Sequence, residues 1–162
     1  MNLNKFVLLL FFVTSLFNAC NDSKDGIIYP PNNESKVTIT QGAWGNVWFL
    51  EGNFMPGSPS GKITPVIRDI YVYEATTDSM TDPPNASSFR TKINSQLISI
   101  IRSDKTGFFQ VYLPPGKYSF FVKEDTLFYA NLWDIEGHIQ SAIVIENKVT
   151  ERQIDIDYKA YY

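Results

Sequence analysis

Apolar and polar positions alternate with a period of two in several short runs. In residues 118–122, Tyr118, Phe120 and Val122 fall on one face of an extended chain, and residues 154–158 read Ile-Asp-Ile-Asp-Tyr. One apolar and one polar face are typical of a half-buried antiparallel strand. Runs rich in β-branched and aromatic residues, separated by Gly, Pro, Asn and Asp, predict strands near 37–41, 44–51, 67–75, 97–103, 107–113, 117–123, 127–131, 141–146 and 149–158.

Turn-forming residues separate these runs at two places. Asp104-Lys-Thr-Gly107 is a tight-turn signal. Leu113-Pro-Pro-Gly116 is another, because neither proline can donate a hydrogen bond to a sheet. Two half-buried sheets stacked face to face make a sandwich. We therefore predict an all-β protein, an antiparallel β-sandwich of about seven to nine strands.

Few other segments have a regular pattern. Residues 87–95 begin with serine, a good N-cap, and fit either two helical turns or a loop. Residues 55–65 and 76–88 are rich in Gly, Pro, Ser, Thr and Asp and predict long loops. We expect a contact surface on loops 55–65, 76–96 and 131–140.

The chain begins with an apolar run. Lys5 is the only charge before Asp22, and within residues 6–17 only Thr14 and Ser15 are polar. The run is too short for a membrane span, which takes about 20 residues. It fits the apolar region of a signal peptide.

The residues that follow, Leu16-Phe17-Asn18-Ala19-Cys20, resemble the lipobox of bacterial lipoproteins. The resemblance implies that residues 1–19 are a lipoprotein signal peptide and that Cys20 carries palmitate-type acyl chains, which hold a protein stably on a membrane. The other interpretation is an ordinary signal peptide, but no Ala-x-Ala triplet is present.

The residues after Cys20 bear on localisation. Asn21 is not the aspartate that retains lipoproteins in the inner membrane of some enteric bacteria, so the resemblance implies the outer membrane. Residues 21–25 partly resemble the surface-export signals of Bacteroidetes lipoproteins. We therefore expect a lipid anchor at the outer membrane, with the protein at the periplasmic face or the cell surface.

A polar segment connects this anchor to the strands. Within residues 21–36 only Ile27, Ile28 and Tyr29 are suited to packing, so we predict a flexible tether over 20–36 and a single domain over 37–162. The alternative is that Ile27 to Tyr29 form an added strand.

Composition narrows the function classes. The 162 residues suit one domain, and 14 Lys+Arg against 17 Asp+Glu give a net charge of −3, which argues against a general nucleic-acid binder. One cysteine and one histidine exclude an intrachain disulfide and a Cys/His zinc site. We expect no metal and no cofactor.

A longer stretch carries a family resemblance. Residues 103–119, SDKTGFFQVYLPPGKYS, resemble the turn–strand–turn–strand core of carboxypeptidase regulatory-like domains. The resemblance covers roughly 43–158 and implies a prealbumin-like (transthyretin-like, Ig-like) sandwich. Residues 45–49 and 70–73 lie where the first two core strands would fall. The whole chain resembles a small Bacteroidetes lipoprotein with one such domain, and this fold does not define an activity.

Candidate catalytic groups are few. His138 lies in a turn-like stretch, and a nucleophile–base pair would need a Ser or Cys beside it in space. Hydroxyisourate hydrolase, an enzyme of related fold, ends in a Tyr-Arg-Gly-Ser-type tail, whereas this chain ends Tyr158-Lys-Ala-Tyr-Tyr162. The sequence has no Gly-rich phosphate loop, His-Glu-x-x-His motif or calcium-loop spacing. We predict a protein that is not an enzyme. A cleft holding His138 or clustered carboxylates would instead favour one.

Aromatic residues exceed what the alternating core faces require. Trp44, Trp48 and Trp133 are the candidate ligand-contact residues, because an apolar ring with a polar tip suits recognition surfaces. The alternative is that the rings pack the outer faces of the sheets and the ends of the sandwich.

Two triplets resemble acceptor sites. Asp78-Ser-Met80 and Asp125-Thr-Leu127 resemble the Asp-Ser/Thr-aliphatic pattern of the Bacteroidetes O-glycosylation system, which makes Ser79 and Thr126 candidates. Together, these features predict a non-catalytic envelope lipoprotein for surface interaction or structural support. Its expected partners are the membrane through Cys20 and an unidentified protein or glycan. The alternative is a carbohydrate-binding accessory module.

Overall fold

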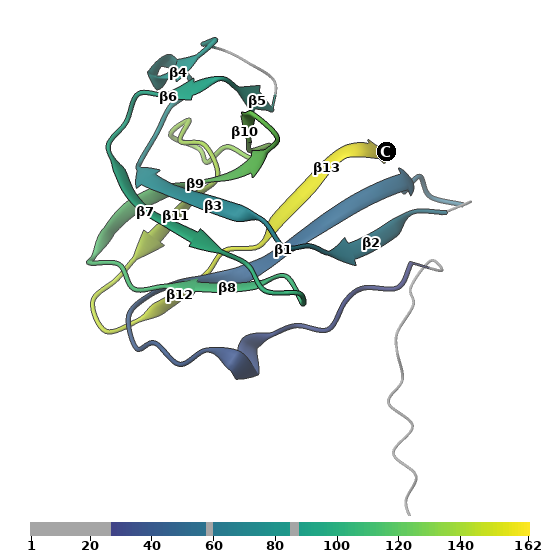
Figure 1. Ribbon diagram of the computed structural model, residues 1–162, viewed down its shortest axis with the longest axis horizontal. Helices are drawn as coiled ribbons and strands as arrows, with labels where there is room; N and C mark the ends of the chain where they lie inside the picture. Colours follow the sequence, from purple (N-terminus) through teal and green to yellow (C-terminus); the bar gives the residue numbers. More distant parts are fainter. Residues whose placement is uncertain (1–26, 58–59, 85–87) are drawn as a thin grey trace, which may run out of the picture.

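Two packed β-sheets and a third, two-stranded sheet form the described part of the molecule in the computed structural model, which covers residues 27–57, 60–84 and 88–162 (Figure 1). The all-β prediction is therefore confirmed. The described residues form two short 3₁₀ helices, η2 (Glu34–Lys36) and η3 (Asp78–Met80). Their strands are β1 (Gly42–Asn53), β2 (Lys62–Pro65), β3 (Asp69–Glu74), β4 (Thr81–Asp82), β5 (Phe89–Arg90), β6 (Lys92–Ile93), β7 (Leu97–Arg102), β8 (Phe108–Val111), β9 (Gly116–Glu124), β10 (Leu127–Tyr129), β11 (Ser141–Val144), β12 (Val149–Glu151) and β13 (Ile154–Tyr161).

The first sheet is built around the long strand β1. Its first half pairs with β8 antiparallel and with β12 parallel, and its second half pairs with β2 antiparallel and with β13 parallel. The parallel pairs differ from the predicted antiparallel order. They are allowed because the chain between β1 and β12 passes through the other sheet, which provides the long crossover that parallel strands need.

The second sheet is antiparallel. Its strands lie in the order β5-β10-β9-β3-β7, and β11 also pairs with β9. The inner faces of the two sheets enclose the main core, to which Ile70, Val72 and Phe120 contribute fully buried side chains. The predicted common face of Tyr118, Phe120 and Val122 is buried in this core.

The outer face of the second sheet is also covered. Phe121 on β9 is fully buried, together with Tyr73, Ile93 and Ile139, in a second apolar cluster. Ile93 and Ile139 come from the segments 76–96 and 131–140, which fold over this face. The sheet is therefore buried on both sides at this end, whereas simple alternation predicts that one face is exposed to solvent.

Several predicted boundaries are wrong. Residues 37–41 form no strand, because Thr38 bonds the side chain of Gln110 and not a neighbouring strand. Residues 88–95 contain the short strands β5 and β6 and no helix, and the predicted loop 55–65 contains β2. The predicted strand 149–158 is split into β12 and β13.

Both predicted turns are present, and each carries the chain from one sheet to the other. The turn over 104–107 leads from β7 to β8, and 113–116 lead from β8 to β9. Gly107 has φ +80°, and a Cβ there would lie 2.6 Å from the carbonyl oxygen of Val47. This turn therefore requires glycine for both its conformation and its close approach to β1.

The segment before β1 lies along the first sheet. Ile27 is buried with Leu50 and Ile63. The side chain of Asn33 is buried and donates to Asn46 Oδ1 at 2.6 Å, and Lys36 pairs with Asp104 at 3.0 Å. Residues 20–26 of the predicted tether lie outside the described residues, whereas residues 27–36 contact the sandwich without forming a strand. No helix in the described part of the chain has the length and apolar character needed to cross a bilayer.

Candidate functional site

Two of the three predicted contact loops meet at one end of the second sheet. Thr77 and His138 form an antiparallel bridge, and the backbone N–H of Ile139 donates to Thr76 at 2.8 Å. The third predicted loop, 55–65, belongs to the tip of the β1–β2 hairpin and lies away from the other two (Figure 1). The structure thus joins loop 131–140 and the described residues of loop 76–96, which exclude 85–87, into one surface, called here the loop surface.

Asp78 connects the two halves of the loop surface. Its Oδ1 accepts a hydrogen bond from the Arg90 guanidinium at 2.8 Å, and its Oδ2 accepts one from the Trp133 indole at 2.9 Å. Arg90 is fully buried, and its guanidinium also donates to the carbonyl of Ala130 at 3.2 Å. The charged partner of this buried arginine is therefore the residue that also orients Trp133.

Trp133 lies at the surface with Arg90 behind it. The guanidinium carbon of Arg90 is 5.7 Å from the centre of the indole, while 43% of Trp133 is exposed. Because Arg90 is fully buried, it covers the inner side of the ring. The exposed part of the indole is accessible to a ligand, and the hydrogen bond to Asp78 fixes the orientation of the ring.

A hollow of about 230 Å³ borders Trp133. It is lined by Leu132, Trp133, Asp134, Ser141 and Arg152. Arg152 Nε is buried, and no described residue accepts a hydrogen bond from it. Burial lowers the pKa of Arg152 and raises that of the neighbouring Asp155. The hollow therefore combines the indole of Trp133 with the polar side chains of Asp134, Ser141 and Arg152, a lining that suits a ring-shaped ligand with apolar faces and polar edges.

The other two candidate tryptophans are placed differently. Trp44 is 6% exposed and packs near Phe108, with ring centres 6.4 Å apart. Trp48 is half-buried beside the apolar cluster of Ile27 and Leu50. Packing therefore accounts for Trp44 and Trp48, and Trp133 is the candidate with an open ring face.

A polar cluster is centred on Asp134. Asp134 Oδ1 accepts the backbone N–H groups of Glu136 at 2.9 Å and His138 at 2.8 Å. Its Oδ2 accepts from Lys117 at 3.2 Å and from Ser141 at 2.8 Å. Burial raises the pKa of Asp134, but these hydrogen bonds outweigh burial and hold that pKa well below its usual range.

The cluster does not have the order of a hydrolytic triad. In such a triad the histidine lies between nucleophile and carboxylate. Here Ser141 donates to Asp134, and His138 Nδ1 lies 3.2 Å from the same carboxylate oxygen. Asp134 therefore lies between Ser141 and His138, so the histidine does not contact the hydroxyl that it would have to activate.

The same cluster has the spacing of a cation site. Ligand atoms of Asp134, Glu136 and His138 lie within 4.8 Å of one another. The ammonium of Lys117 is 2.6 Å from Glu136 and 3.2 Å from Asp134, so a protein cation already pairs with both carboxylates. The hydrogen bond to Glu136 raises the pKa of Lys117. This arrangement fixes loop 131–140 against β9.

Sequence reasoning missed the central contacts of the site. Arg90 lies in a two-residue strand and carries no local signal of burial, and Lys117 is 17 residues from Asp134. The repeat of Asp134, Glu136 and His138 at every second position was the available signal for the polar cluster. Asp78 drew attention only as the first residue of a glycosylation triplet.

The remaining candidates are dispersed. Ser79 is exposed in η3 on the loop surface, where its hydroxyl lies 3.0 Å from that of Thr77. Thr126 is exposed in the turn between β9 and β10. Cys20 lies outside the described residues.

Comparisons with protein-family models, with curated proteins and with solved structures gave no match to this chain.

Proposed function

We propose that this protein is a lipid-anchored cell-envelope protein whose sandwich is a non-catalytic interaction module at the outer membrane. The anchor rests on the N-terminal order of Lys5, the apolar run 6–17, and Ala19 followed by Cys20. This is the position at which a single cysteine serves attachment to lipid. The sandwich is assigned to the carboxypeptidase regulatory-like class on the resemblance of residues 103–119.

The loop surface is the contact surface in this proposal. The observation that carries it is the contact of Asp78 with both Arg90 and Trp133, which holds two loops and one exposed indole in a fixed arrangement. A pre-ordered surface loses little conformational entropy on binding, which favours a role in recognition. The polar cluster around Asp134 supports the same loop from its other side.

Intact mass spectrometry of the protein extracted from bacterial membranes tests the anchor. We expect loss of residues 1–19 and a mass increase from acyl chains on Cys20. The Cys20→Ser variant should lack this increase and should no longer float with membranes in a density gradient. Cleavage at another residue, or a mature mass without lipid, would refute the anchor. A hexose-containing increment would separately report modification of Ser79 or Thr126.

Carbohydrate binding is the second candidate function. The specific observation in its favour is that Trp133 is 43% exposed beside the hollow that contains Ser141 and Arg152. Sugar rings present apolar C–H faces to an indole and hydroxyl groups to polar neighbours, which matches this lining.

A glycan array with the mature protein tests this second function. We expect binding that is lost in Trp133→Ala and retained in Tyr112→Ala, which removes an aromatic ring that is 66% exposed elsewhere on the surface. Thermal melting of both variants should confirm that each is folded. Equal binding by the two variants would exclude Trp133 as the contact residue.

A further inference from the structure

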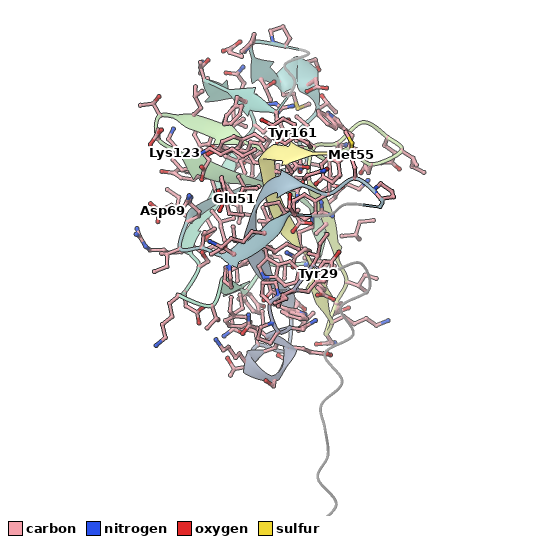
Figure 2. All side chains as sticks on the ribbon, turned by 90° about the vertical axis from the view of Figure 1, so that its right-hand side faces the viewer. Tyr29, Glu51, Met55, Asp69, Lys123 and Tyr161 are labelled. Atoms are coloured by element: carbon pink, nitrogen blue, oxygen red, sulfur yellow. The ribbon has the colours of Figure 1, made fainter. Side chains whose placement is uncertain are left out.

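A second surface with exposed aromatic residues lies near the C-terminal end of β1, away from the loop surface. The side chains of Ile28, Tyr29, Met55, Tyr161 and Tyr162 are each 48–68% exposed. In Figure 2 the labelled members Met55 and Tyr161 lie close together, and Tyr29 lies on the same side of the molecule. These five residues are called here the anchor-side patch.

Packed neighbours support the patch. The ring centres of Phe54 and Tyr162 are 5.8 Å apart, and the backbone N–H of Phe54 donates to Tyr161 at 2.8 Å. Tyr29 is near enough to contribute to the raised pKa of Tyr162. Beneath the patch lies the small apolar cluster formed around Leu50. The rings of the anchor-side patch are therefore held in place by packed neighbours.

A shallow apolar hollow extends the patch along β2. It measures about 380 Å³, and its lining includes Ile28, Tyr29, Lys62 and Ile63. Lys62 is the only charged residue in this lining. Its side chain is 70% exposed and its ammonium lies 3.8 Å from the carboxylate of Glu51, in an exposed ion pair that a lipid headgroup can exchange for its own charge.

The length of chain between patch and anchor decides what covers this surface. Ile28 is eight residues from Cys20, and eight extended residues span at most about 27 Å. An acylated Cys20 therefore keeps the patch near the bilayer at all times. Tyrosine rings with polar hydroxyl tips are enriched at membrane–water interfaces, and the patch carries three of them.

We propose that the anchor-side patch rests on the lipid surface into which Cys20 is inserted. This inference depends on the proposed lipid anchor and adds an orientation to it. With the patch on the membrane, the loop surface with Trp133 is held away from the lipid, since it lies at a distance from the β1–β2 hairpin tip (Figure 1). The membrane contact therefore leaves the loop surface accessible to a partner.

Single-cysteine labelling of the mature lipoprotein tests the orientation, because acylation blocks Cys20. An environment-sensitive fluorophore is placed at Met55→Cys or Tyr161→Cys in the patch and at Lys123→Cys or Asp69→Cys as controls on another side (Figure 2). The proteins are reconstituted into vesicles of phosphatidylethanolamine and phosphatidylglycerol, with and without nitroxide-labelled lipid. We expect quenching at the patch to exceed quenching at the controls by at least about twofold.

The outcomes separate the anchor from the orientation. Failure of the protein to float with vesicles would refute the anchor, and with it the proposed function. Flotation with equal quenching at all four labels would refute the orientation alone. The Cys20→Ser variant without vesicles provides the last control. A patch label already shielded from water there would show that protein contacts cover the patch, which also overturns the inference.

Discussion

At the residue scale, Asp134 organises the loop in which it lies. Its carboxylate accepts hydrogen bonds from two backbone N–H groups and two side chains, and these bonds favour the ionised form. Because the pKa of Asp134 is lower in the folded protein than in the unfolded chain, ionisation stabilises the fold above the unfolded value of about 4. This stabilisation is lost as the pH falls through the folded pKa.

We predict that Asp134→Asn lowers the melting temperature at pH 7, where the carboxylate is ionised, and that the difference from wild type shrinks at acid pH. Melting curves between pH 7 and pH 2 measure this convergence. Glu146→Gln, which removes an exposed carboxylate from the turn after β11, serves as the control and should show no such trend. A constant difference across the range would contradict the role given to Asp134.

At the scale of elements, one ion pair connects η3 to the short strand β5. Arg90 is fully buried, and Asp78 is the carboxylate paired with it. Removing Asp78 would leave a buried guanidinium without its charged partner, which costs roughly 1–3 kcal/mol. We predict that Asp78→Ala destabilises the protein by about this amount and shifts the fluorescence of Trp133, because the indole also loses its acceptor.

Chemical denaturation monitored by fluorescence measures this cost. Asp69→Ala is the matched control, since it breaks the ion pair of Asp69 with Arg102. The side chain of Arg102 is 68% exposed and that of Asp69 is 42% exposed. Such exposed pairs contribute about 0–1 kcal/mol. A double-mutant cycle of Asp78→Ala with Arg90→Met should give a coupling of about 0.5–3 kcal/mol. Additive effects would show that the pair does not hold the loops together.

At the scale of the whole molecule, alternation in the sequence predicted the main strands because burial of one face was enough to define them. Strand β9 carries this signal, with Phe120 inward at 0% exposure. The same strand also carries a buried residue that alternation did not predict. Phe121 is buried on the opposite face by loops 76–96 and 131–140, and a cover supplied by distant segments leaves no period in the local sequence.

The candidate site was predicted only in outline for the same reason. Loop composition identified segments 76–96 and 131–140, and aromatic content drew attention to Trp133. The contacts among Asp78, Arg90 and Trp133 join residues 12 and 55 positions apart in the chain, so no local spacing encodes them. The packing of Trp44 and Trp48 likewise depends on strands that pair only after folding.

The arrangement of the two sheets predicts how the whole molecule unfolds. Strand β1 pairs with four strands, and the turns at 104–107 and 113–116 connect one sheet to the other, so neither sheet can separate without disrupting the shared core. Phe120 lies in this core, 6.2 Å from the ring of Phe109. We predict that Phe120→Ala lowers the free energy of unfolding by roughly 3–5 kcal/mol.

Circular dichroism and tryptophan fluorescence should report this loss in a single shared transition, because the loop surface is fixed to the same sheet as the core. Tyr112→Ala removes a ring that is 66% exposed and should change the stability by no more than about 0.5 kcal/mol. Separate transitions for the two probes would mean that the loop surface unfolds independently. The pre-ordered contact surface proposed above requires one cooperative unit, so this measurement tests the fold and the function together.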